Sequence, residues 1–255
     1  ATLAPTVNNA LRAQVEQADP TLDADLAMWF HPDCALPRLH LLGPVHAVTR
    51  GKPLTLRKPY MTEMLTYIAT RSQGITVEEL AETFNITTNK ARVYAAGIRE
   101  WLGTNPRTGQ PHLPDARLAP AAATRGVPLY QVVDILIDTD LFRRLRTRAE
   151  ARGPDGIDDL ITALSLVEGR PYDYPLEREA AGGWAWLVDG DRSDQHMAVA
   201  IVDVAHIVTT HALATSDLTT ARTAAETAAL AAPHEEIPRL DLAAVAHAAG
   251  HHAEA

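Results

Sequence analysis

Features that would indicate secretion or membrane insertion are missing from this chain of 255 residues. It has one cysteine, Cys34, so it can form neither an internal disulfide nor a metal site with two thiolates. No run of about 18 apolar residues is present to span a bilayer, and the amino terminus has neither the basic nor the apolar region of a signal peptide. These absences predict a soluble, cytoplasmic protein that makes no membrane contact.

An initiating methionine is also missing, since the chain begins at Ala1. We therefore expect a fragment of a longer protein, whose other parts can include a membrane-attached or wall-binding segment. The location of that parent protein is for this reason less constrained than the location of the fragment.

Motifs of enzyme chemistry are absent as well, because there is neither a phosphate-binding loop nor a Gly-x-Ser-x-Gly turn. His247 and His251 are four residues apart, which places two imidazoles on one helix face, but neither a glutamate motif nor a second ligand cluster accompanies them. Asp155, Asp158 and Asp159 open a helix, where they complement its dipole without forming an acid/base pair. We expect no catalytic residue, no metal site, no cofactor and no enzyme activity.

Positive charge is scarce overall, and the formal net charge is −9. Residues 1–38 hold two basic and five acidic groups, residues 39–140 hold eleven and nine, and residues 141–255 hold ten and eighteen. Only the middle segment can favour a phosphate backbone, with an affinity that falls as salt is added. The acidic carboxyl-terminal third would repel DNA and is better suited to a protein partner.

The apolar fraction of 46% is sufficient for the cores of two domains of ordinary size. We expect a mainly α fold with a small β-sheet. Residues 1–37 contain four prolines, which predicts an amino-terminal arm or linker with one short helix near residues 23–30. Trp29 and Phe30 are expected to pack onto the following domain, since exposed they would form an apolar patch.

Residues 38–137 have the order of a winged helix-turn-helix domain. The pattern predicts a strand over residues 39–48, a turn at residues 50–52 and a second strand over residues 53–56. Helices are then expected over residues 60–72, over residues 77–84 with a capping box at Thr76 and Glu79, and from Thr87 or Thr88 to Leu102.

The third of these helices has the pattern of a DNA recognition helix. Ala91, Ala95, Ile98 and Leu102 repeat at helical spacing and are expected to face the core. The opposite face is small and cationic, as a helix in a major groove must be. The candidate DNA-binding residues on it are Thr88, Asn89, Lys90, Arg92, Ala96 and Arg99. A solvated helix face with three cations would have the same pattern, so this alternative stays open.

A wing hairpin is expected after this helix. The alternating apolar run over residues 127–137 predicts a returning strand around residues 130–133, with its partner around residues 112–118. Arg117 and Arg125 are then candidate phosphate contacts at the wing, and solvated loop arginines are the alternative.

Residues 138–255 have helical periodicity throughout. Helices are expected over residues 141–152, 157–168, 193–214, 218–231 and 237–249, and the short breaks between them imply antiparallel neighbours. Ala221, Ala225 and Ala228 would allow close helix contacts. The order resembles a tetratricopeptide-like stack, through which the chain is expected to bind a protein partner or self-associate.

This order of parts, with the motif Ala-Leu-Ser-Leu-Val-Glu-Gly-Arg-Pro at residues 163–171, is similar to the actinobacterial antibiotic regulatory proteins of the SARP family. The resemblance covers about residues 36–250 and implies a winged helix-turn-helix joined to a bacterial transcriptional activator domain (BTAD). It also implies that Trp184 and Trp186 bind a partner. Residues 29–33 and 112–115 are more similar to a subgroup found at the end of large membrane-attached, sometimes LysM-containing, chains.

Two functions follow from these expectations. The first is a DNA-binding transcription regulator with a helical activator domain. The second is a protein-interaction module of a larger membrane-associated protein, in which the winged helix no longer binds DNA. The short link at residues 85–87, where regulators of this type have a longer loop, favours the second function, and the basic helix face favours the first.

Overall fold

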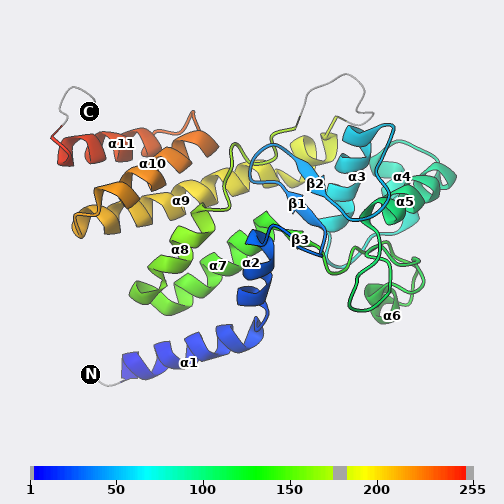
Figure 1. Ribbon diagram of the computed structural model, residues 1–255, viewed down its shortest axis with the longest axis horizontal. Coiled ribbons are helices and arrows are strands. Elements are labelled where there is room, and N and C mark those ends of the chain that lie inside the picture. Colours follow the sequence, from blue (N-terminus) through cyan, green and yellow to red (C-terminus); the bar gives the residue numbers. More distant parts are fainter. Residues whose placement is uncertain (1–2, 175–182, 251–255) are drawn as a thin grey trace.

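The computed structural model describes residues 3–174 and 183–250, which form a mainly helical protein with one small three-stranded sheet (Figure 1). This confirms the predicted mainly α class with a small β component. The helices are α1 (Leu3–Ala18), α2 (Leu22–Phe30), α3 (Lys58–Ala69), α4 (Val77–Thr83), α5 (Thr88–Leu102), α6 (Pro120–Arg125), α7 (Asp138–Arg152), α8 (Ile157–Leu164), α9 (Ser193–Ala214), α10 (Leu218–Ala231) and α11 (Ile237–Ala248).

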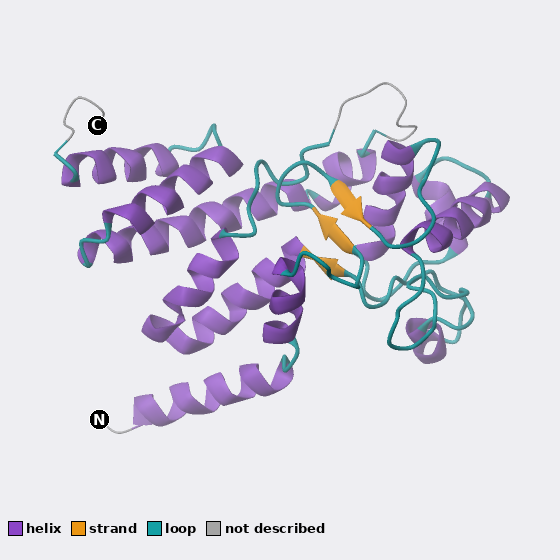
Figure 2. Cartoon of the chain, viewed as in Figure 1, coloured by secondary structure: helices purple, strands orange, loops and turns teal. Residues whose placement is uncertain are grey.

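The strands are β1 (Arg38–His40), β2 (His46–Val48) and β3 (Leu136–Ile137), in the order β2-β1-β3. β1 pairs antiparallel with β2 and parallel with β3. The sheet lies between two groups of helices, with α3 to α6 on one side and α7 to α11 on the other (Figure 2).

The predicted division of the sheet is wrong. Residues 39–48 form two strands rather than one, and residues 53–56 form none. The chain turns at residues 41–45 because the amides of Leu41 and Leu42 donate to the buried carboxylate of Asp138, at distances of 2.7 to 2.9 Å. Gly43 is required at this turn, since a Cβ there would lie 2.9 Å from that of Glu168.

The predicted three-helix unit is confirmed as α3, α4 and α5, which enclose an apolar cluster that includes Leu65, Ile98 and Leu102. The capping box at the start of α4 is present, with the amide of Glu79 donating to Thr76 Oγ1 over 3.1 Å. Asn85 has a positive φ of 48° in the turn that follows. Thr87, not Thr88, caps α5.

The predicted wing hairpin is wrong in detail. Residues 112–118 and 129–133 lie close together, because Val133 N donates to His112 O and Leu129 N donates to Ala116 O, over 2.8 and 2.7 Å. They form no strand pair, however, and α6 occupies the connection between them. Only the end of the alternating run becomes a strand, β3, and it pairs with β1.

The amino-terminal segment is more ordered than the sequence predicts, since it consists of α1 and α2 rather than a linker with one helix. Trp29 is buried in the larger apolar cluster together with Leu22 and Leu26 of α2, as expected for Trp29. Phe30 remains 54% exposed, so the expectation that it packs onto the domain is wrong.

The carboxyl-terminal helices form consecutive packed pairs, α7 with α8, α9 with α10, and α10 with α11. Their bounds agree with the sequence prediction to within one residue, except that α7 begins at Asp138 rather than at residue 141 and α8 ends at Leu164 rather than at residue 168. The larger apolar cluster joins these helices to β1 and β3 through Leu39, Leu136 and Ile137. The sheet therefore shares its core with the helical stack more than with α3 to α5.

One described helix, α9, is long and apolar enough to cross a membrane, with a mean hydropathy of 1.6. Asp203 and His206 interrupt its apolar sequence. In the structure α9 packs against α8, α10 and α11, and Ile201 and Val204 on it are fully buried. Length and composition alone do not distinguish a spanning helix from the core helix of a soluble protein.

Candidate nucleic-acid interface

The outward face of α5 carries most of the predicted recognition residues. Its inward face is fixed by Ala91, Ala95, Ile98 and Leu102, all buried as the periodicity predicts. A 3.6-residue repeat then leaves the other side in solvent. The residues exposed there are Asn89, Lys90, Arg92, Val93 and Ala96, while Thr88 is half-buried.

The two cations near the start of α5 are not neutralised within the described part of the chain. Lys90 makes no ion pair there, and Arg92 donates over 3.1 Å to Asn89 Oδ1, a neutral acceptor one turn away. Thr87 Oγ1 accepts from the amide of Lys90, which leaves the first turn of α5 well formed. The face therefore combines two available positive charges with an amide side chain.

Arg99 has a different role from the one predicted. Its Nε donates to Leu113 O over 2.7 Å and one terminal nitrogen donates to Pro114 O over 3.0 Å. The guanidinium thus holds the loop after α5 against the helix and is not free to contact DNA. The sequence pattern missed this because the two acceptors lie 14 and 15 residues further along the chain.

The predicted wing arginines are exposed, but they lie in a segment that forms no β-hairpin, since Arg117 is in a loop and Arg125 ends α6. The side chain of Arg117 makes no hydrogen bond within the described part of the chain, and its backbone amide donates to Asp115 Oδ1 over 3.0 Å. The side chain of Arg125, at the end of α6, reaches Gln73 O at a long distance of 3.5 Å. Both side chains are therefore accessible to a phosphate backbone, although the predicted strands do not present them.

Arg57 is a further cation at this surface that the sequence analysis did not single out. It has a positive φ of 53° immediately before α3 and donates over 2.5 Å to the hydroxyl of Tyr94, which lies on α5. The pair Arg57-Lys58 at the start of a helix was the available signal. Its position places an additional guanidinium beside α5.

Acidic groups moderate the charge of the surrounding surface. Glu78 and Glu82 are exposed on α4, and Glu100 on α5 pairs with Lys52 over 3.5 Å. Burial raises the pKa of Tyr130, while the positive charges of Arg92 and Arg99 lower it.

Comparison of the chain with protein-family models, with curated proteins and with solved structures gives no match. What the surface binds is therefore argued from its own residues.

Trp184 and Trp186, predicted to bind a partner, lie between the two groups of helices. Trp184 is 3% exposed and stacks on Tyr174 at 4.9 Å between ring centroids. Trp186 is half-buried and packs edge-on against Tyr67 of α3 at 5.2 Å. Their indoles therefore pack at the junction between the helical stack and α3, and Trp184 is buried there; that the two tryptophans bind a partner stays a prediction.

A buried carboxylate lies at the same junction. Glu63 of α3 is fully buried, and its Oε1 accepts from the backbone amide of Trp184 over 2.9 Å. Burial raises the pKa of Glu63, while the Trp184 amide and the nearby Trp186 indole act to lower it. Among the described residues, the indole nitrogen of Trp186 has no hydrogen-bond partner. Arg71 completes the junction by stacking on Tyr67 at 3.5 Å and pairing with Asp191 over 2.7 Å.

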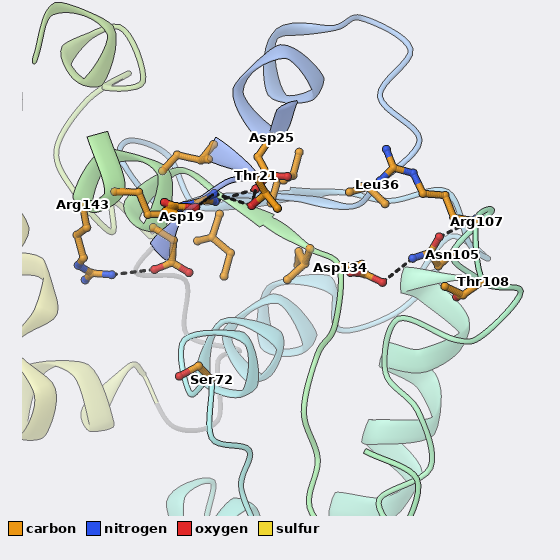
Figure 3. Close-up of a pocket in the computed structure, with 16 residues that line it drawn as sticks. Asp19, Thr21, Asp25, Leu36, Ser72, Asn105, Arg107, Thr108, Asp134 and Arg143 are labelled. Carbon is orange, nitrogen blue, oxygen red and sulfur yellow. Dashed lines mark hydrogen bonds and ion pairs between the residues drawn. The ribbon is translucent and has the colours of Figure 1, made fainter. Parts of the chain in front are cut away.

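A cavity with a volume of about 840 Å³ lies between α2, α7 and the loop at residues 105–108 (Figure 3). Polar and charged side chains that line it pair with one another: the neutral amide of Asn105 donates to Asp134 over 2.6 Å, and Arg143 donates to Asp140 over 3.0 Å. Among the described residues, no three His, Cys, Asp or Glu side chains are grouped so that they could hold a metal ion. We find no reactive constellation in this cavity.

Proposed function

We propose that the chain binds double-stranded DNA through the amino-terminal half of α5, as a transcription regulator. In this proposal α3 to α5 and the segment around α6 form a winged helix-turn-helix, and α7 to α11 form a tetratricopeptide-like stack that binds a protein. The observation that supports it is the exposed, unneutralised pair Lys90 and Arg92 beside Asn89. Side chains of these types bond to base edges and phosphates in a major groove.

The position of the acidic groups is compatible with this proposal. α5 lies at the opposite end of the molecule from α10 and α11, so the acidic stack does not cover Lys90 or Arg92 (Figure 1). The electrostatic repulsion of DNA by the carboxyl-terminal third is screened beyond about 10 Å at 0.1 M salt. Arg57, Arg117 and Arg125 would then add phosphate contacts around the recognition helix.

A salt titration of binding to random duplex DNA tests this proposal. We expect the logarithm of the binding constant to fall linearly with the logarithm of salt, and the double variant Lys90→Ala, Arg92→Ala to lose about two units of slope. The matched control is Arg222→Ala, Arg239→Ala, which removes the same charge from exposed positions on α10 and α11. Equal binding by the two double variants would contradict the proposal.

A second candidate function is a protein-interaction module that does not bind DNA. The observation that favours it is Val93, which is 68% exposed in the middle of the same helix face. Leu56, two residues before α3, and Leu118, two residues before α6, are also exposed. Negligible DNA binding at low salt by the unaltered chain would favour this second function.

A further inference from the structure

An apolar groove lies between α8, α9 and α10, with a volume of about 300 Å³. Leu164, Val208 and Ala224 line it, one from each helix, and all three are buried. Ile161 of α8 also lines the groove and is 39% exposed. The remaining wall includes one serine and four threonines, and all of these residues together are called the α8–α10 groove.

Three hydroxyl groups in the α8–α10 groove already donate within their own helices. Ser165 Oγ donates to Thr162 O over 2.7 Å. Thr223 Oγ1 and Thr227 Oγ1 each donate to the carbonyl four residues earlier, over 3.0 and 2.8 Å. An extended peptide would bring unpaired backbone groups to this surface, whereas a helix satisfies its backbone internally. The groove therefore favours a helical partner.

The apolar surface continues along α10 beyond the groove. Leu230 lies three residues after Thr227 and seven after Thr223, so the three side chains share one side of α10. Leu230 is 56% exposed. A docked helix presents apolar side chains at positions i, i+3 or i+4, and i+7, and such a row suits a groove that ends in an exposed leucine.

The charges that flank the α8–α10 groove are acidic. Asp158 is exposed in the first turn of α8, and Asp217 is the exposed N-cap of α10. Asp217 accepts from the amide of Thr220 over 3.1 Å, and hydrogen bonds from Thr220 lower the pKa of this carboxyl. Neither aspartate has a cationic partner within the described part of the chain. Arg222, the cation of α10, faces Glu226 at 4.0 Å, and the described lining contains neither lysine nor arginine.

We propose that the α8–α10 groove is the docking site for a cationic amphipathic helix of a partner protein. The apolar side chains of this helix fill the groove beside Ile161 and Leu230, and its lysines or arginines face Asp158 and Asp217. Apolar burial supplies affinity, while complementary charge selects the partner. The proposal rests on the protein-binding role proposed above for α7 to α11 but not on DNA binding, because the groove lies away from α5 (Figure 1).

Two synthetic helices of about 18 residues test the proposal, since this length allows a helix in water. Both have a leucine stripe, and the other positions are lysine-rich in one and glutamate-rich in the other. We expect the lysine helix to bind the unaltered chain at least about tenfold more tightly in fluorescence anisotropy. In methyl NMR of the full chain, the signals of Ile161, Leu164 and Val208 should shift, with little change in α3 to α5.

Two variants of equal charge locate the binding. Thr223→Lys places a cation at the groove and should weaken binding of the lysine helix at least about tenfold, because like charges then face each other. The control Val199→Lys alters a residue that is 55% exposed and lies nine positions before Val208, on the opposite side of α9. It should leave this binding nearly unchanged.

Both variants should keep the DNA-binding salt dependence of the unaltered chain, so a failure of DNA binding and a failure of the groove are separate results. Absence of binding by the lysine helix, equal weakening by the two variants, or methyl shifts confined to other helices would overturn the proposal.

Discussion

At the scale of single residues, the arginines of α5 have separate roles although they lie two turns apart on one helix. Arg99 donates to two buried loop residues, Leu113 and Pro114, while Arg92 is exposed and bonds only to Asn89. Removal of a donor from a buried carbonyl costs its full desolvation penalty, whereas removal of an exposed charge costs little. The two residues therefore affect different properties of the protein.

We expect Arg99→Ala to lower the free energy of unfolding by about 2 kcal/mol, because two loop carbonyls lose their charged donor. Arg92→Ala should change it by less than about 0.5 kcal/mol. Urea unfolding followed by circular dichroism measures both values. If Arg92→Ala proved the more destabilising substitution, the assignment of Arg99 as the residue that holds the loop would be wrong.

His40 gives the protein a specific sensitivity to acid. Burial lowers its pKa from 6.5 to about 4, with further contributions from the nearby His46 and Arg38. Between pH 6.5 and pH 4 the unfolded chain binds a proton at this residue and the folded chain does not, so stability falls as the pH falls. We expect the unaltered chain to lose about 2 kcal/mol more than His40→Gln between pH 7 and pH 5.

Unfolding in urea at the two pH values checks this expectation. His40 stacks on His46 at 4.1 Å and lies beside Trp29 at 4.5 Å, so the substitution also changes packing at both pH values. Only the difference between the pH profiles of the unaltered chain and His40→Gln therefore reports the protonation of His40. Parallel profiles for the unaltered chain and His40→Gln would show that His40 titrates normally in the folded state.

At the scale of elements, helices with a regular apolar repeat could be predicted from the sequence and the sheet could not. The buried positions Ala91, Ala95, Ile98 and Leu102 were predicted from spacing alone. The alternating run that ends in β3 instead divides its buried residues between two clusters, with Tyr130 in one and Leu136 in the other. Alternation reports which residues are buried, but not the strand or helix against which they pack.

The candidate site shows the same limit. Exposure of Lys90 and Arg92 follows from local periodicity, so the sequence predicts it. The roles of Arg99 and Trp184 depend on partners 14 and 121 residues away. α1 was missed for a related reason, since it is held by ion pairs to α7 across more than 100 residues.

The capping box at the start of α4 contributes to stability through local hydrogen bonds. Thr76 Oγ1 accepts from the amide of Glu79, and Glu79 Oε2 accepts from the amide of Thr76 over 2.6 Å. We expect Thr76→Ala to destabilise the protein by about 1 kcal/mol in urea unfolding. Thr223→Ala on α10, whose hydroxyl bonds only to its own helix, is the control and should be nearly neutral. Equal losses would mean that the capping box does not stabilise α4.

At the scale of the whole molecule, the two large apolar clusters are joined through residues far apart in sequence. Trp184 belongs to the cluster of the helical stack, while Glu63, which accepts its amide, lies in α3 beside residues of the other cluster. Trp186 packs against both clusters. This junction is the structural reason to expect the two groups of helices to unfold together.

We expect Trp184→Ala to separate that unfolding into two steps. The substitution removes a fully enclosed indole and leaves a cavity, which lowers the free energy of unfolding by about 3 to 5 kcal/mol. The lost contacts are those between the two clusters. In calorimetry the unaltered chain should give equal calorimetric and van't Hoff enthalpies, and the variant should give a calorimetric enthalpy that exceeds the van't Hoff value. Val202→Ala, buried within the helical stack alone, should lower the transition temperature without splitting the transition. A single sharp transition in Trp184→Ala would mean that the sheet, and not the tryptophan junction, couples the two groups of helices.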